Sequence, residues 1–187
     1  VDFNDQVSAD PKARAVVLNL MEQIRRRAEA AAAERPEGRL GSETEFGAWP
    51  FAVFFRAVQA YYEATGKDKF LKLMCRYADH IEKVFKIDDS ATFVTPGHPE
   101  IELALVKLYR CTGERRYLEL SRFFVDKRGN NEKDKDKNCH QPAGKYQQDH
   151  LPLREQKTAE GHSVRACYMY SGMADIAYEC DDESLFD

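Results

Sequence analysis

Two glycine-histidine pairs occur in the chain, each directly before a segment with helical periodicity: Gly97-His98 and Gly161-His162. A neutral imidazole both donates and accepts directional hydrogen bonds, and the N-terminus of a helix favours anionic or hydroxyl-bearing ligands. The two pairs are therefore candidates for contacts to a small polar ligand. The alternative is that each histidine only caps its helix, and the sequence leaves both interpretations open.

Other polar residues near helix starts are weaker candidates for ligand contacts. They are Glu100, Asp149, His150 and Arg165. The run from Asp149 to Glu155 is densely polar, but a loop held by salt bridges and helix capping would have the same composition. Acidic residues are common near helix starts because they interact favourably with the helix dipole. The sequence therefore predicts no catalytic residue among these carboxylates.

The elements that would position these residues are helical hairpins. In the segment 97–126, apolar residues recur at helical spacing on both sides of Thr112-Gly113, where glycine can adopt the left-handed conformation that ends a helix. The segment 62–79 repeats this pattern 47 residues earlier, with its turn at Thr65-Gly66. A third, weaker copy spans 161–181. Such repeats bury the apolar face of each hairpin against a neighbouring unit.

The repeats predict an all-α fold with six helices in three hairpins. An (α/α)6 barrel and an open helical solenoid both satisfy this pattern. If the hairpins pack side by side, alternate helices run parallel, so the second, fourth and sixth helices begin at the same end. His98 and His162 would then face one rim. The polar segment 127–146 has little to bury and is predicted to be a mobile loop.

Composition narrows the class of protein. The 187 residues carry a net charge of −4, which argues against a nucleic-acid or anionic-membrane partner. No apolar run approaches the ~20 residues of a membrane-spanning helix. The five cysteines show no paired spacing, which favours a reducing, cytoplasmic location, and Cys75, Cys111 and Cys167 are predicted to be buried in helices. We expect one domain over residues 1–187.

Three stretches resemble a known enzyme family. They are AYYEATGKDKFLKLMCRYADHI (60–81), PGHPEIELALVKLYRCTGERRYLELSRFFVDKRG (96–129) and QDHLPLREQKTAEGHSVRACYMYSGMADIA (148–177). These stretches look very like bacterial glycoside hydrolases of the β-L-arabinofuranosidase type, glycoside hydrolase family 127. The resemblance covers roughly the last two thirds of the chain, from Ala60 to Asp187.

The resemblance implies an (α/α)6 barrel followed, in full-length members, by β-sandwich domains. It also implies retaining hydrolysis by a cysteine nucleophile on a zinc centre, with a glutamate as acid/base, and sugar contacts from His98 and His162. In the family, the segment with the nucleophile, acid/base and zinc ligands comes after the point where this sequence stops, so we expect no metal site or catalytic residue in this chain. The family's upstream histidine motifs are also unmatched, because residues 42–59 read SETEFGAWPFAVFFRAVQ.

Two functions from different classes follow. The first is part of a glycoside hydrolase that acts on L-arabinofuranosides or similar glycosides and contributes sugar contacts. The second is a helical-repeat module that binds a protein partner on a concave face. The paired glycine-histidine motifs favour the first. We further expect the chain alone to lack glycosidase activity, and to self-associate because part of a barrel leaves apolar helix flanks uncovered.

Overall fold

The computed structural model describes residues 48–91, 94–130 and 144–185, and within these ranges its regular structure is helical, with no β-strand. The α-helices are α3 (Ala48–Thr65), α4 (Lys69–Glu82), α5 (Ile101–Thr112), α6 (Arg115–Lys127) and α7 (Ser163–Cys180). A π-helical turn (Lys83–Ile87) extends α4, and short 3-10 turns span Lys145–Gln147, Leu153–Glu155 and Glu183–Leu185. The all-α prediction is confirmed for the described residues. The predicted first helix, before residue 48, lies outside them.

The two Thr-Gly turns form as the repeat predicts, and they are built alike. Gly66 and Gly113 have φ of 67° and 74°, and each amide donates 2.7 Å to the carbonyl four residues earlier. In both turns the threonine hydroxyl donates to the preceding helical turn, at 2.6 Å for Thr65 and 2.7 Å for Thr112. The third copy ends in the same way, because Asp181 takes the left-handed conformation, with φ of 52°.

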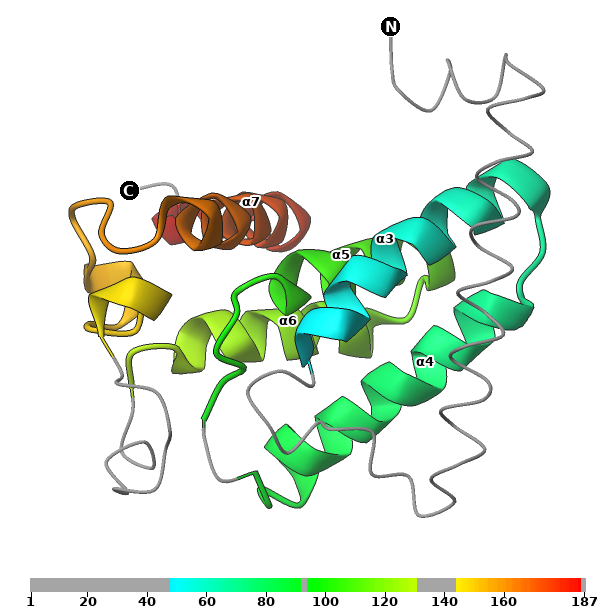
Figure 1. Cartoon of the computed structure of the whole chain (residues 1–187), viewed down its shortest axis with the longest axis horizontal. Helices are drawn as coiled ribbons and strands as arrows, with labels where there is room; N and C mark the ends of the chain where they lie inside the picture. The colour runs from blue at the N-terminus through cyan, green and yellow to red at the C-terminus, as the bar shows by residue number, and fades with distance from the viewer. Residues whose placement is uncertain (1–47, 92–93, 131–143, 186–187) are drawn as a thin grey trace, which may run out of the picture.

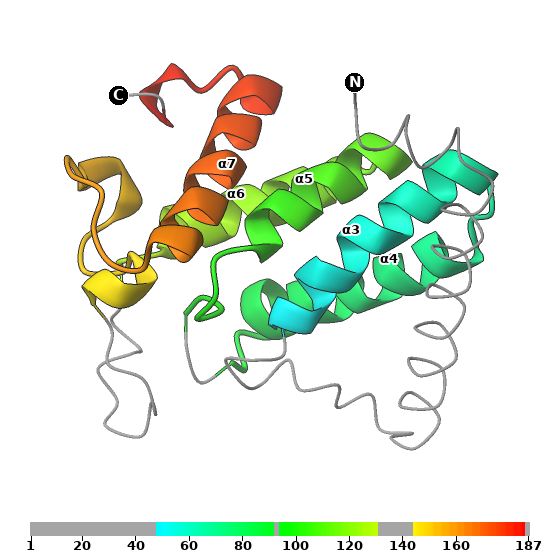
Figure 2. The same cartoon turned by 45° about the horizontal axis from the view of Figure 1, so that its top comes forward.

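The helices form hairpins that lie side by side (Figures 1 and 2). The hairpins α3/α4 and α5/α6 are neighbours, and α5 contacts α3, α6 and α7. Helix α7 packs on α5 and α6. Its contact with α5 is close, since a Cβ added to Gly172 would lie 3.1 Å from Glu102 Cβ. The middle of α7 therefore lies against the start of α5.

Two apolar clusters hold this arrangement. The first joins α3 through α6 and includes Phe55, Ile81, Leu105 and Phe124, all fully buried. The second joins α5, α6 and α7 and includes Val106, Leu118, Met169 and Ile176. Because α5 contributes to both clusters, it is the central element of the described fold. Among the described residues, no helix is long and apolar enough to span a membrane.

The start of α5 and the burial of one cysteine differ from what the sequence indicates. Pro99 is compatible with the first turn of a helix, but α5 begins at Ile101, two residues later, because Glu100 keeps a non-helical φ of −150°. Cys167 is exposed rather than buried, because it lies on the outer face of α7. The face of α7 that packs on the core carries Ala166, Met169 and the buried residues of the following turns. Cys75 and Cys111 are half-buried, and burial raises the pKa of both thiols.

The predicted mobile loop, 127–146, has ends that belong to folded structure. Lys127 is the last residue of α6, the Arg128 side chain is fully buried, and Tyr146 lies in a 3-10 turn. The middle of the segment, 131–143, lies outside the described residues, so its mobility stays a prediction.

Candidate functional site

His98 lies in the loop directly before α5. Its side chain is 19% exposed, and Nδ1 is 3.7 Å from Oε2 of the buried Glu100 carboxylate. The ring also lies against α7, with its centroid 5.9 Å from that of Tyr168. Glu100, a weaker sequence candidate, is thus a direct neighbour of the histidine.

The surroundings of His98 disfavour the charged imidazolium. Burial of the ring, together with the charges of Arg165, Arg128 and His162, lowers the pKa of His98 from 6.5 to about 4. The Glu100 carboxylate, 3.7 Å from Nδ1, carries the opposite charge. At neutral pH His98 is therefore an uncharged ring with one nitrogen donor and one nitrogen acceptor.

His162 lies directly before α7 and is exposed. Its ring meets Tyr146 edge-on at a centroid distance of 5.3 Å, and the Arg165 guanidinium lies 4.7 Å from the centroid of the same tyrosine. Arg165 also donates to the carbonyl of Gly97 at 3.0 Å. One side chain of α7 therefore links the loop that carries His98 to the aromatic contact of His162.

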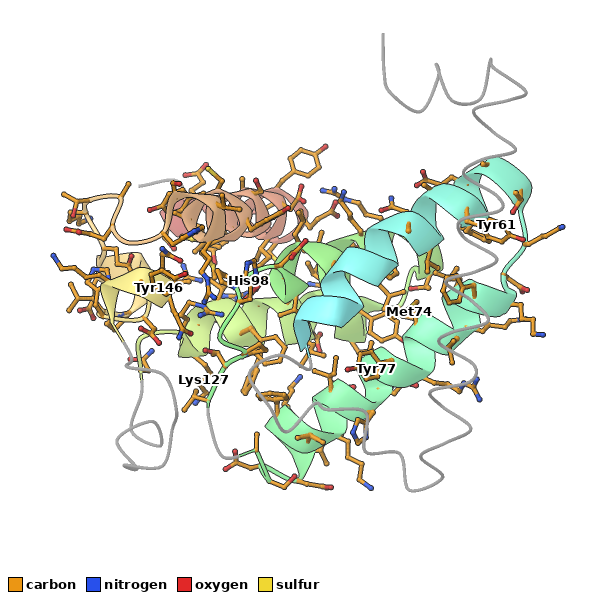
Figure 3. The ribbon with its side chains drawn as sticks, in the orientation of Figure 1. Tyr61, Met74, Tyr77, His98, Lys127 and Tyr146 are labelled. Atoms are coloured by element: carbon orange, nitrogen blue, oxygen red, sulfur yellow. The ribbon has the colours of Figure 1, made fainter. Side chains whose placement is uncertain are left out.

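Both histidines lie at one end of the helix layer, as the hairpin topology predicts. Figure 3 shows His98 and Tyr146 on the side where α7 begins, while Tyr61, near the end of α3, lies at the far side. The structure also weakens the capping alternative. His162 occupies the N-cap position of α7 without a side-chain capping bond, and the N-cap of α5 is Glu100 rather than His98.

A buried ion pair lies beneath this rim. The side chains of Arg128 and Glu102 are 0% and 1% exposed, and Arg128 Nη2 is 3.2 Å from Glu102 Oε1. The same guanidinium donates to the carbonyls of Pro96 at 2.7 Å and Gln147 at 3.2 Å. Burial raises the pKa of Glu102, whereas the charge and hydrogen bond of Arg128 lower it.

The loop that leads into α7 is held by Gln148 and Gly161. The Gln148 side chain is fully buried, and its amide donates to the carbonyls of Glu160 at 2.9 Å and His162 at 3.4 Å. Gly161 has φ of 81°, and a Cβ there would overlap the carbonyl oxygen of Lys145. The position of His162 therefore depends on a backbone contact that a larger residue cannot make.

The other two weaker candidates have different surroundings. Asp149 is buried and accepts a hydrogen bond from the amide of Gly144, so this carboxylate shapes the loop. His150 is half-buried, and within the described part of the chain its Nδ1 has no hydrogen-bond partner. It interacts electrostatically with Glu160, whose pKa is lowered chiefly by a hydrogen bond from Lys145.

Sequence reasoning missed the residues that support the rim. Arg128 stands at the start of a strongly charged run, which is typical of a solvated segment, and Gln148 was a neutral residue in a polar stretch. Tyr146 and Tyr168 could have been found from their spacing to His162, but their contacts depend on the tertiary fold. Burial of Arg128 needs three distant segments to meet, and local composition carries no signal for that.

Comparison with known proteins decides the family. Residues 21–187 match the model of the β-L-arabinofuranosidase GH127 catalytic domain. The chain belongs to glycoside hydrolase family 127. A curated GH127-like relative, the non-reducing end β-L-arabinofuranosidase of Bifidobacterium longum subsp. longum, is 35% identical over 146 residues. That alignment covers 72% of this chain and 22% of the relative, so the chain spans about a fifth of the relative's length.

Solved GH127 structures support the fold. The β-L-arabinofuranosidase from Geobacillus stearothermophilus T6 superposes with a TM-score of 0.74 and 35% identity over 94% of this chain and 31% of that one. A second GH127 β-arabinofuranosidase gives a TM-score of 0.66 and 38% identity over 75% and 21% of the two chains. The prediction of helical hairpins that form part of an (α/α)6 barrel is confirmed by this likeness.

The zinc centre implied by the family resemblance does not fit the described residues. They contain no group of three or more histidine, cysteine or acidic side chains that could hold a metal ion. The cysteines in the described ranges lie on α4, α5 and α7 and form no disulfide. We therefore derive no chemical step through a metal in this part of the protein.

Proposed function

We propose that this chain is a helical part of a glycoside hydrolase that acts on L-arabinofuranosides or similar glycosides. Its role in that enzyme is to bind the sugar through His98 and His162. Membership of GH127 supports the reaction class, and the β-L-arabinofuranosidase activity of the Bifidobacterium relative supports the sugar. The residues for bond cleavage lie in the remainder of the full-length protein, so the chain alone is inactive.

One observation carries the sugar-binding role: His98 is held uncharged at a rim that it shares with His162. A sugar hydroxyl both donates and accepts hydrogen bonds, and a neutral imidazole complements it without the cost of desolvating a charge. Tyr146 and Tyr168, which flank the two histidines, add ring edges and faces of the kind that pack on sugar rings. Helix capping does not require any of these contacts.

The test uses the full-length gene product and an aryl β-L-arabinofuranoside. We expect His98→Ala and His162→Ala each to lower kcat/KM by an amount equivalent to about 0.5–1.5 kcal/mol, the usual net value of a hydrogen bond to a neutral group. His80→Ala on α4 is the matched control, because His80 is absent from the charges that act on His98. Equal losses in all three variants would refute the specific role of the rim.

The alternative function, a helical-repeat module for protein binding, is not favoured by the comparisons. The matched family model describes a catalytic domain, and the structural neighbours are arabinofuranosidases or a glycoside hydrolase. The helical hairpins therefore belong to an enzyme barrel. A helical-repeat module for partner binding would not explain this family match.

A further inference from the structure

Arg128 is the first residue after α6, and its guanidinium is inaccessible to solvent. It is bonded to three segments that are distant in sequence. Two of its bonds end on backbone carbonyls, of Pro96 and of Gln147, and the third ends on the Glu102 carboxylate of α5. A single side chain thus ties two loops to the central helix.

Each of these loops carries one rim histidine. The Pro96 carbonyl is two residues before His98 in the first loop. The Gln147 carbonyl adjoins Gln148, whose buried amide donates to the carbonyls of Glu160 and His162 in the second loop. The bonds that fix the backbone of both histidines therefore converge on Arg128.

We infer that Arg128 is a positioning residue that sets His98 and His162 at their common rim. The substrate side of this inference rests on the proposed function, whereas the geometric side stands on the contacts of Arg128 alone. Arg128 cannot act on a ligand directly, because its side chain is fully buried. It acts through the backbone of the two loops.

The pair with Glu102 does not explain Arg128 by itself. A buried ion pair often contributes little net stability, and well-packed apolar residues can replace it. No apolar residue could replace the two bonds to the Pro96 and Gln147 carbonyls, since these need a donor. The fork of the guanidinium reaches all three acceptors, whereas the ammonium of a lysine is a single compact group.

A pair of variants separates positioning from charge pairing. Arg128→Met leaves the Glu102 carboxylate buried without its cation and destabilises the fold. Combining Arg128→Met with Glu102→Leu removes both charges, which restores much of the stability but leaves the two loop carbonyls without a donor. Arg128→Lys keeps the charge and loses the fork. All are made in the full-length gene product.

Arg110→Met is the matched control. Arg110 joins α5 to α7, through bonds to Asp175 at 3.0 Å and Glu179 at 2.6 Å. It lies in the last turn of α5, at the end of these two helices that is remote from the rim. Its loss removes ion pairs between two packed helices without touching either histidine loop.

Three readouts are compared: thermal unfolding, amide hydrogen exchange of residues 94–100 and 144–162, and kcat and KM on the aryl arabinofuranoside. We expect the double variant to unfold near the wild-type temperature yet exchange faster in both loops. Its kcat/KM should fall by about tenfold to a hundredfold, the range for a misplacement of about 1 Å. Arg128→Lys should show the same loop exchange, and Arg110→Met should match the wild type in exchange and kcat/KM.

Wild-type loop exchange and kcat/KM in the double variant would overturn the inference and leave Arg128 as the charge partner of Glu102. If Arg128→Met does not fold, the double variant and Arg128→Lys decide the matter by the same readouts. If the wild type itself shows no glycosidase activity, the proposed function fails. Loop exchange still supports or overturns the positioning role in that case, so the two failures are distinguishable.

Discussion

Acidification should charge His98 in the folded chain only at a pH far below that of an ordinary histidine, and the fold should lose stability as the pH falls toward that value. The pKa of His98 is about 4 in the folded chain against 6.5 for an unperturbed ring. Between these values the unfolded state binds more protons than the folded one, so stability rises with pH across this window. Above the unfolded pKa the imidazole is neutral in both states and contributes no pH dependence.

The magnitude follows from the two pKa values. At about pH 5, linkage gives a loss of about 2 kcal/mol relative to neutral pH, since the unfolded ring is almost fully protonated while the folded ring is mostly neutral. Burial of the ring is the largest cause and sets the sign of the shift. The charges of Arg165, Arg128 and His162 also oppose protonation, whereas the Glu100 carboxylate favours it from 3.7 Å.

The assay is hydrogen–deuterium exchange at the histidine Cε1 position, read by mass spectrometry on peptides that contain His98. It gives the pKa of the individual ring, and urea unfolding of wild type and His98→Gln at two pH values gives the stability difference. We expect a pKa of His98 well below 6.5, and a smaller pH-dependent loss of stability in His98→Gln. A His98 pKa at or above 6.5 would refute the reasoning, because neither burial nor the neighbouring cations would then govern the ring.

Two further predictions concern the backbone and the exposed face of α7. Gly161→Ala should destabilise the fold far more than Gly113→Ala. Both glycines have positive φ, but only at Gly161 would the new Cβ overlap a carbonyl, that of Lys145. Urea unfolding should show a loss of about 1–2 kcal/mol at Gly113 and clearly more at Gly161. The 187-residue chain alone should self-associate, because the apolar side chains of Val164 and Tyr178 on α7 are 51% and 76% exposed. Sedimentation should show a smaller mass for the double variant Val164→Lys/Tyr178→Lys than for the wild type.

The hairpins could be read from the sequence because their signals are local. Thr-Gly at Thr65-Gly66 and Thr112-Gly113 fixes the end of a helix through glycine's left-handed conformation, and the apolar spacing on either side gives the buried face. The common rim of His98 and His162 followed from topology, since parallel helices in neighbouring hairpins begin at the same end. These inferences needed no knowledge of which side chains meet.

The supporting residues could not be read in this way. Arg128 has lysine on one side and a charged run beyond the following glycine, a composition that indicates solvent exposure. Its burial arises only when the Pro96 and Gln147 loops fold over the end of α6. The start of α5 shows a smaller limit of the same kind: Pro99 is compatible with a first helical turn, but the non-helical backbone of Glu100 delays the helix by two residues.

The rim combines features that a fold selected for stability alone would avoid. It contains a buried ion pair, a histidine whose charged form is disfavoured, and a glycine whose backbone touches another carbonyl. Each of them restricts what the sequence can place there, and a buried ion pair in particular is a poor source of net stability. The apolar core between α3 and α7 needs none of them, because its clusters are continuous without the rim. Substitutions of His98 and His162 at neutral pH should therefore affect ligand binding more than folding, and substitutions of Leu105 or Met169 should do the reverse.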